Sequence, residues 1–333
     1  MHTRQRNHGD PLSAALPRDT TAAPDVSFII ANYNAQEFLS KCLTSVFAQR
    51  SSRSFEVLVV DDHSHDGSVE MVRRMFPRVQ LFTNPRNLGY ARSCNKAIGS
   101  SLGRYIYLLN NDIELLPETM DALVQLLERQ PEVGAVGCAL RDPDGTLQAA
   151  SKALPTIRSA FFGGRSFLSR WFPGNGFTRR ELLQWKVEAG VPFEAGYVSG
   201  ASMLVRREEL DRIGTLDEDL FYFNDADFCK RLWDAGRQVV CLPQAEAVHH
   251  EHSGGSMISF RQRFRSLKWF HLGAYRYYRK HVRDSILHPM SWFVIGALGS
   301  RFVAAGLLQL GQEAGGAVTA VVKRLRTTQA GES

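Results

Sequence analysis

Three short polar segments carry side chains that could bind a nucleotide or a metal ion. They are Asn32-Tyr33-Asn34, the run from Asp61 to Ser68, and Asn110-Asn111-Asp112. Carboxylates such as Asp61, Asp62 and Asp112 can accept hydrogen bonds from a nucleobase or a ribose. They can also hold Mg²⁺ or Mn²⁺, which prefer hard oxygen ligands. Taken alone, each segment is equally typical of a turn or a helix N-cap, where Asn, Asp and Ser are frequent.

Each polar segment directly follows a predicted buried strand. The strands at Val26–Ala31, Phe55–Val60 and Tyr105–Leu109 are short apolar runs, as buried parallel strands are. Further strands at 79–82 and 133–138 alternate with helices at 36–48, 68–75, 90–100 and 117–128. This alternation predicts an α/β fold, a mainly parallel sheet flanked by helices on both faces. Because ligands bind beyond the carboxyl ends of such strands, the three segments together favour a site.

The second half of the chain has a weaker pattern. Residues 141–195 predict a mobile loop region over the site, because their hydrophobic periodicity is weak. Helices at 207–213 and 225–235 and strands at 238–242 and 247–250 follow. Neither a G-x-x-x-x-G-K-[ST] loop nor a G-x-G-x-x-G turn after the first strand occurs, which argues against P-loop kinases and Rossmann dehydrogenases.

The composition is that of an ordinary globular protein. Of 333 residues, 44% are hydrophobic and 22% are charged, which excludes collagen-like and disordered chains. The five cysteines form no C-x-x-C pair, and residues 1–24 read as a flexible polar leader without a signal peptide. Reduced thiols in the cytoplasm are the simplest interpretation.

Positive charge gathers in the C-terminal extension, residues 257–333. From Ile258 to Ser333 there are twelve Lys and Arg against three Asp and Glu. Residues 260–283 interleave these cations with aromatic residues, and the charge-free stretch Ser285–Ser300 has 16 residues, too few to span a bilayer. A solvated helix face is one interpretation. A nucleic-acid surface is disfavoured because no binding motif accompanies it. We expect an amphipathic extension at the cytoplasmic face of the inner membrane, with 286–310 in or on the bilayer.

Residues 25–256 carry an ordered set of motifs that resembles glycosyltransferase family 2, and within it the rhamnosyltransferase-like members. The motifs are SFIIANYNAQEFLSKCLTSVFAQ, FEVLVVDDHSHDGS, NPRNLGYARSCNKAI, YIYLLNNDIELLPE, VSGASMLVRREELDRIGTLDEDLFYFNDADFCKRLWDAG and VHHEHSGGS. The resemblance implies a GT-A-type fold, a nucleotide-sugar donor, Mg²⁺ or Mn²⁺, and inversion at the anomeric carbon.

The resemblance also implies which residues form the nucleotide site, with Asp61 or Asp62 accepting from the base. The implied nucleotide-binding residues are Asn32, Tyr33, Asn34, Glu37, Asp61, Asp62, Asn87, Gly89, Asn95, Asn110 and Asn111. Asn110-Asn111-Asp112 occupies the D-x-D position, with Asn in place of the first Asp, which leaves metal dependence open.

The catalytic base implied by the resemblance is Asp225, in Asn224-Asp225-Ala226-Asp227, which matches the family's E-D-x-D with Asn in place of Glu. It would remove a proton from the acceptor hydroxyl. Outside the resemblance, an N-cap would be the simpler role for Asp225. The implied donor and acceptor contacts are Ser199, Gly200 and Ala201. Trp185 could stack on a sugar or pack in the core, and Asp227 could position the site or complement the helix dipole.

The implied metal ligands are Asp112 and a histidine of the segment His249-His250-Glu251-His252. Alternate residues of a strand face opposite sides, so His250 and His252 could share a face that His249 does not. The Gly254-x-Ser256 pattern that follows the histidine in the family favours His250, with His252 second.

The function implied is an inverting glycosyltransferase that moves L-rhamnose from dTDP-rhamnose to a lipid-linked or polysaccharide acceptor in the cell envelope. One alternative is a UDP-hexose or UDP-N-acetylhexosamine donor on the same fold. Another is a non-catalytic sugar-nucleotide or membrane-binding homologue, since Asn110 and Asn224 stand where acids are usual.

Overall fold

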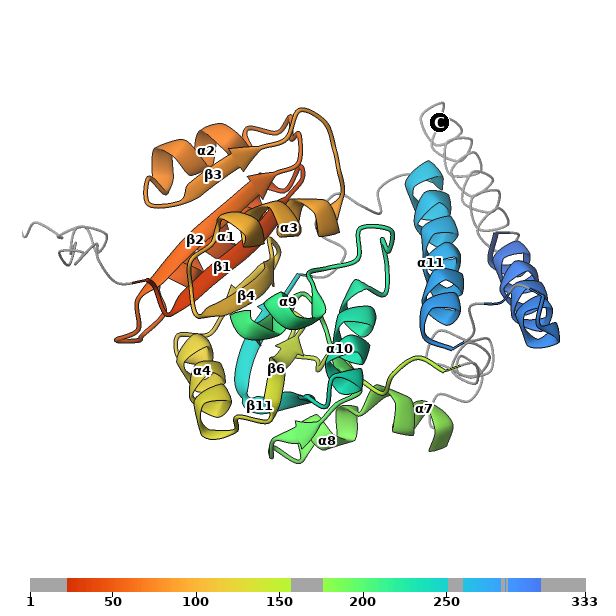
Figure 1. The fold of residues 1–333 in the computed structure, drawn as a ribbon. Coiled ribbons are helices and arrows are strands. Elements are labelled where there is room, and N and C mark those ends of the chain that lie inside the picture. The colour runs from red at the N-terminus through yellow and green to blue at the C-terminus, as the bar shows by residue number, and fades with distance from the viewer. Residues whose placement is uncertain (1–22, 157–175, 251–259, 283–284, 286, 307–333) are drawn as a thin grey trace, which may run out of the picture.

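The computed structural model describes residues 23–156, 176–250, 260–282, 285 and 287–306 (Figure 1). Within them, one sheet of nine strands forms the centre of the molecule. Its strands, in spatial order, are β3 (Gln80–Thr83), β2 (Phe55–Asp61), β1 (Val26–Asn32), β4 (Tyr105–Asn110), β10 (Ser202–Arg206), β6 (Val133–Arg141), β11 (Gln238–His249) and β5 (Ile113–Leu115), while β8 (Phe193–Glu194) pairs with β11.

Parallel pairing joins the strands that end in the polar segments. β1 pairs in parallel with β2 and with β4, and β2 with β3. The register sets Asn32 opposite Asp61 and Ala31 opposite Asn110, so the polar segments leave one edge of the sheet side by side. β10 runs antiparallel between β4 and β6 and so joins the two parallel parts of the sheet. The predicted mainly parallel α/β fold is confirmed.

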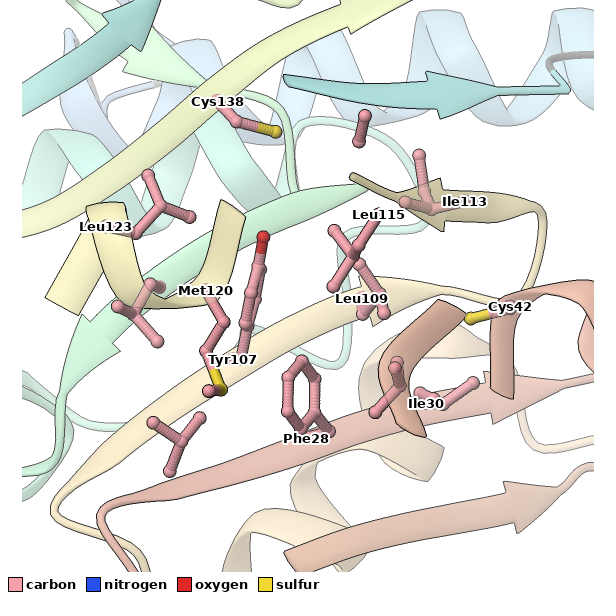
Figure 2. Close-up of a cluster of buried hydrophobic side chains, with 14 of the residues drawn as sticks. Phe28, Ile30, Cys42, Tyr107, Leu109, Ile113, Leu115, Met120, Leu123 and Cys138 are labelled. Atoms are coloured by element: carbon pink, nitrogen blue, oxygen red, sulfur yellow. The ribbon is translucent and has the colours of Figure 1, made fainter. Parts of the chain in front are cut away.

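The two faces of the sheet are covered by different helices. Alternating side chains sort between two apolar layers, with Phe28 and Ile30 in one and Ile29 in the other. The first layer contains α1 (Gln36–Phe47), α2 (Ser68–Met75) and α4 (Thr119–Arg129). The second contains α3 (Tyr90–Ser100), α9 (Arg207–Ile213) and α10 (Asn224–Asp234). Figure 2 shows part of the first layer, where Phe28 lies beside Tyr107, 5.1 Å between ring centroids. Burial of this kind contributes about 25 cal/mol per Å² of apolar surface.

The segment expected to be a loop region has more regular structure than its weak periodicity indicated. β6 extends to Arg141, and in the described residues five short elements separate it from β10. They are β7 (Ser151–Lys152), α7 (Gly176–Leu182), α8 (Gln184–Glu188), β8 and β9 (Tyr197–Val198), of which β7 and β9 pair with each other. Residues 157–175 lie outside the described part. The two strands predicted at 238–242 and 247–250 are one strand, β11, with a register shift between Leu242 and Glu246.

Two helices follow the sheet in the C-terminal extension. The first is α11 (Phe260–His281), and residues 289–306 form a second helix (Figure 1). They pack together through Tyr278, Val294 and Leu298, and through the rings of Phe264 and Phe302, 5.4 Å apart. Among the residues that the structure describes, every helix is too short or too polar to span a bilayer.

Candidate active site

Side-chain hydrogen bonds join the three polar segments where they leave the sheet. The Asn32 amide donates to Asp61 Oδ2 at 3.0 Å and accepts from Asn111 Nδ2 at 2.8 Å. Asn32 and Asp61 are buried, so these hydrogen bonds form largely out of contact with water. The segments therefore meet at one sheet edge, as the strand order requires.

The two carboxylates after β2 organise the surrounding loops. Asp62 accepts hydrogen bonds from Leu88 N at 2.7 Å, Gly89 N at 2.8 Å and Asn84 Nδ2 at 3.0 Å. Gly89 takes a positive φ of 92°, a conformation in which glycine avoids the strain of a side chain. Asp61 holds its own loop, since Oδ1 accepts from the Ser64 N–H at 2.9 Å.

Several implied nucleotide-binding residues lie at or near the surface, outside the buried pair formed by Asn32 and Asp61. Tyr33 is exposed, Asn34 has a φ of 48°, and Asn87 is exposed on the loop held by Asp62. Glu37 points to solvent and pairs with Lys41 at 2.9 Å, and Lys41 lowers the pKa of that carboxyl.

Asn95 binds protein backbone instead of leaving its amide for a ligand. Its amide donates to Leu216 O at 2.9 Å and accepts from Leu216 N at 3.1 Å. It thereby fastens α3 to the segment that leads into α10, and its contribution is to hold the fold.

Asp112 and His249 face each other with two acceptor atoms. Asp112 Oδ1 is buried and lacks a hydrogen-bond donor among the described residues, and His249 Nε2 lies 3.4 Å from it. The amide nitrogen of Gln148 donates to Asp142 Oδ1 and to His249 O, so its oxygen, 2.7 Å from His249 Nδ1, must accept. Nδ1 of the neutral ring therefore carries the hydrogen, and the lone pair of Nε2 faces Asp112.

This arrangement fits a divalent cation between Asp112 and His249. Two acceptor atoms repel each other unless a cation or a proton lies between them, and a hydrogen bond to the far ring nitrogen is the usual support of a metal-binding histidine. In the described part of the chain no three potential ligands cluster, so this pair would leave further positions to phosphate oxygens and water.

The histidine beside Asp112 is therefore His249, and not the favoured His250. His250 Nε2 lies 2.7 Å from Glu114 Oε1, and its ring packs on Phe38 at 5.4 Å. His249 is the last residue of β11, where it pairs with Ile113 on β5. Because successive side chains of an extended chain point to opposite faces, the side chain of His250 points away from that of His249. His252 lies outside the described residues.

Asp225 stands in the first turn of α10 and lines a cavity of about 510 Å³, together with Ser199, Lys152 and His249. Its Oδ1 accepts from Ala226 N at 2.8 Å, and Oδ2 from Gly200 N at 3.4 Å. Burial raises the pKa of Asp225, because a charged carboxylate loses hydration there.

The loop at 199–201 connects Asp225 to the polar sheet edge. Ala201 O accepts from Asn110 N at 2.9 Å, while Gly200 O accepts from the Tyr90 hydroxyl at 3.1 Å. Burial also raises the pKa of Tyr90, with smaller contributions from the charges of Asp225 and Asp112. Sequence reasoning had not singled out Tyr90. Its signal is its place at the helix start directly after the Asn87-Leu88-Gly89 motif.

Asp227 and Trp185 lie outside the lining of this cavity, as far as the described residues show. Asp227 is fully buried and bonds to Arg231 at 2.9 Å, Lys280 at 2.9 Å and His281 at 2.7 Å. These partners lower the pKa of Asp227 to about 2 against the effect of its burial. It therefore ties α11 to α10, while Trp185 is exposed on α8 beside Lys186.

The sequence was compared with family models and known proteins. The model for glycosyl transferase family 2 matches residues 27–202, more than half of the chain and all three polar segments. The chain belongs to glycosyltransferase family 2. The predicted family is thus confirmed, and with it the assignment as a glycosyltransferase.

Two relatives of this chain carry names that state a rhamnosyltransferase activity or a part in O-antigen biosynthesis. An N-acetylglucosaminyl-diphospho-decaprenol L-rhamnosyltransferase of Mycobacterium tuberculosis is 30% identical over 297 residues, which cover 83% of this chain and 92% of that protein. The O-antigen biosynthesis protein RfbC of Myxococcus xanthus is 29% identical over 252 residues, 72% of this chain but 18% of that protein.

A solved structure supports the fold of this family 2 member. The mannosyltransferase PcManGT from Pyrobaculum calidifontis, determined with GDP-mannose and Mn²⁺, aligns with a TM-score of 0.54 at 20% identity. The alignment covers 92% of this chain and 83% of the neighbour. At this identity the likeness shows the GT-A-like fold.

Proposed function

We propose that the protein is an inverting glycosyltransferase that moves L-rhamnose from dTDP-rhamnose to a lipid-linked or polysaccharide acceptor of the cell envelope. The observation that carries this proposal is Asp225, which lines the cavity through which an acceptor can approach. The donor sugar and the acceptor class rest on the name of the mycobacterial relative.

Asp225 acts as the general base. An acceptor hydroxyl in the cavity loses its proton to the carboxylate as its oxygen attacks the anomeric carbon, and a single displacement inverts that carbon. The Gly200 N–H holds Oδ2, so the carboxylate keeps one orientation. The raised pKa makes Asp225 a stronger base than a solvent-exposed aspartate.

Asp112 and His249 would hold Mg²⁺ or Mn²⁺ at the edge of the same cavity. When bound, the ion neutralises charge on the departing nucleoside diphosphate. Gln148 keeps the His249 ring oriented through Nδ1. With the leaving group stabilised in this way, one protein base suffices.

The C-terminal helices would hold the enzyme at the cytoplasmic face of the inner membrane. At the start of the last described helix, Trp292 is 60% exposed and Phe293 58% exposed, beside exposed Leu287 and Met290. Trp is favoured at the lipid–water interface. Arg265, Lys268 and Arg279 are exposed on α11 and would attract anionic headgroups.

The test is calorimetric titration of the full chain with dTDP and with UDP, each with and without Mg²⁺ or Mn²⁺. We expect dTDP to bind more tightly, and the metal to strengthen its binding. A preference for UDP would replace the donor with a UDP-hexose or UDP-N-acetylhexosamine. Binding of neither nucleotide would contradict the proposed function.

A further inference from the structure

Tyr90 stands between the loop that Asp62 holds and the loop that holds Asp225. It is the first residue of α3 and directly follows Gly89, whose N–H donates to Asp62 Oδ2 at 2.8 Å. At the other end of its side chain, the Tyr90 hydroxyl donates to Gly200 O at 3.1 Å. One residue therefore joins the polar sheet edge to the loop beside the proposed base.

Gly200 lies between the Tyr90 hydroxyl and Asp225. Its N–H donates to Asp225 Oδ2 at 3.4 Å. A methyl group placed on its Cα would lie 3.7 Å from the Tyr90 hydroxyl oxygen and 3.6 Å from Asp225 Cβ. Because the hydrogen bond to Asp225 is long, a small shift of the Gly200 backbone is enough to break it. The position of this backbone therefore decides whether Oδ2 has a donor.

The two ends of the loop at 199–201 are fixed by backbone hydrogen bonds. Ser199 N donates to Ala150 O at 2.8 Å, and Asn110 N donates to Ala201 O at 2.9 Å. The middle carbonyl of the loop is held by the tyrosine side chain instead. A single substitution can therefore release that anchor and leave the other two in place.

The helix that carries Tyr90 fixes the position of its hydroxyl. The ring is partly buried and packs against the second apolar layer. α3 is fastened to the segment before α10 by Asn95 and by Arg92, which pairs with Glu218 at 3.1 Å. Because a tyrosine side chain has only two rotatable bonds, an anchored helix and a packed ring leave the hydroxyl little freedom.

Titratable groups on several elements lie near Asp225. They are Lys152 on β7, Tyr90 on α3, Cys229 on α10, Tyr277 on α11 and His249 on β11. Burial raises the pKa of the two tyrosines and of the thiol, so these groups stay neutral where a carboxyl group titrates. The Lys152 and His249 side chains are the same in a variant at position 90. The Tyr90 hydroxyl therefore acts on Asp225 through the backbone between them, without a charge of its own.

We propose that Tyr90 is a positioning residue for the base, because its hydroxyl holds the Gly200 backbone where the N–H orients Asp225 Oδ2. This inference rests on the proposed function and deepens it. It ties the orientation of the base to the loop that Asp62 holds beside the proposed nucleotide site.

The test compares Tyr90→Phe, which removes the hydroxyl and keeps the ring, with Tyr105→Phe. The Tyr105 hydroxyl is buried and has no hydrogen-bond partner among the described residues, so this change is a matched control. The pKa of Asp225 is measured by NMR titration of isotope-labelled aspartate carboxyl groups, with the signal assigned through Asp225→Asn. The Gly200 N–H lowers the pKa of Asp225 by stabilising the charged form, so Tyr90→Phe should raise that pKa by about half a pH unit. Tyr105→Phe should match the wild type.

Hydrolysis of dTDP-rhamnose, with water in place of the acceptor, gives a second measurement. Tyr90→Phe should lower kcat by about tenfold, because the base is less well oriented, while dTDP affinity stays within a factor of two. The acid limb of its pH profile should move upward by about half a pH unit, in step with the pKa of Asp225. A purely structural role for the hydroxyl would not move this limb.

An unchanged pKa of Asp225 in Tyr90→Phe would overturn the proposal, as would an equal shift in Tyr105→Phe. Failure of the wild type to bind dTDP and UDP would instead contradict the proposed function. The two failures are distinguishable, because the comparison of Asp225 pKa values needs no nucleotide.

Discussion

The polar sheet edge and the Asp225 side of the molecule contain similar residue types in opposite states. At the sheet edge, carboxylates and amides satisfy one another, as Asp62 does with three donors. On the other side, Asp225 is held by two backbone N–H groups and has a raised pKa. Between the two regions, Asp112 at the end of the third polar segment has a buried oxygen without a hydrogen-bond donor among the described residues and faces His249. In the first region the polar side chains satisfy one another's hydrogen bonds. In the second, we propose that Asp225 accepts a proton from the acceptor, and between the two regions that Asp112 and His249 hold a cation.

The same contrast recurs within α10. Asp225 and Asp227 are two residues apart, yet burial raises the pKa of the first, while hydrogen bonds from His281 and Lys280 and the charge of Arg231 lower that of the second to about 2. Residue type alone therefore does not distinguish a catalytic carboxylate from a structural one. The surroundings of each carboxyl group determine its pKa.

The largest expected effect is that of Asp225→Asn. If Asp225 is the general base, as we propose, its removal should lower kcat for sugar transfer by about 10³-fold, while nucleotide affinity stays within a factor of two. The acid limb of the wild-type pH profile should lie above the usual aspartate range, because the base works only when deprotonated and burial raises its pKa. Full transfer activity in the variant would remove Asp225 from the chemistry.

Asp62→Ala tests the hydrogen-bonded sheet edge. Three donors lose a buried acceptor, so the free energy of unfolding should fall by roughly 3 kcal/mol in urea denaturation. Glu37→Ala removes an exposed carboxylate from the same part of the chain and should leave the urea concentration at the unfolding midpoint unchanged. Equal effects of the two changes would show that burial at Asp62 does not matter.

Asp227→Asn tests the ionic contact between α10 and α11. A pKa lowered to about 2 stabilises the fold by about 2–3 kcal/mol at pH 7. This contribution is present above the ordinary aspartate pKa and is lost as the pH falls through about 2. The stability difference between wild type and variant, measured in urea, should therefore shrink between pH 5 and pH 2. A stability difference that does not change with pH would show that the variant loses packing rather than the ionic contact of Asp227.

The smallest expected effect separates the two histidines. His249→Ala should weaken metal-dependent nucleotide binding by about tenfold, because the ion loses one of two protein ligands. His250→Ala removes a side chain that bonds Glu114 and should leave that binding unchanged. Calorimetry with dTDP and Mn²⁺ compares them, and the reverse ranking would restore His250 as the ligand.

The sheet and the meeting of its polar segments were predictable, because strand periodicity fixes which loops share an edge. Which histidine lies beside Asp112 was not, because the Gly254-x-Ser256 pattern favoured His250, whereas the pairing of β11 with β5 brings His249 to Asp112. The role of Asp227 was also hidden, since its partners Lys280 and His281 lie more than 50 residues later and reach it through tertiary packing.

The position of β10 in the sheet has a consequence for biosynthesis. β1, β2, β3 and β4 have all their mutual partners in the chain up to residue 110, whereas among the described strands β6 pairs only with the later strands β10 and β11. About 60 residues separate the end of β6 from the start of β10, which is roughly 3–12 s of translation. During that interval β4 and β6 each present an unpaired edge, so the nascent chain is most prone to aggregation before residue 206 emerges.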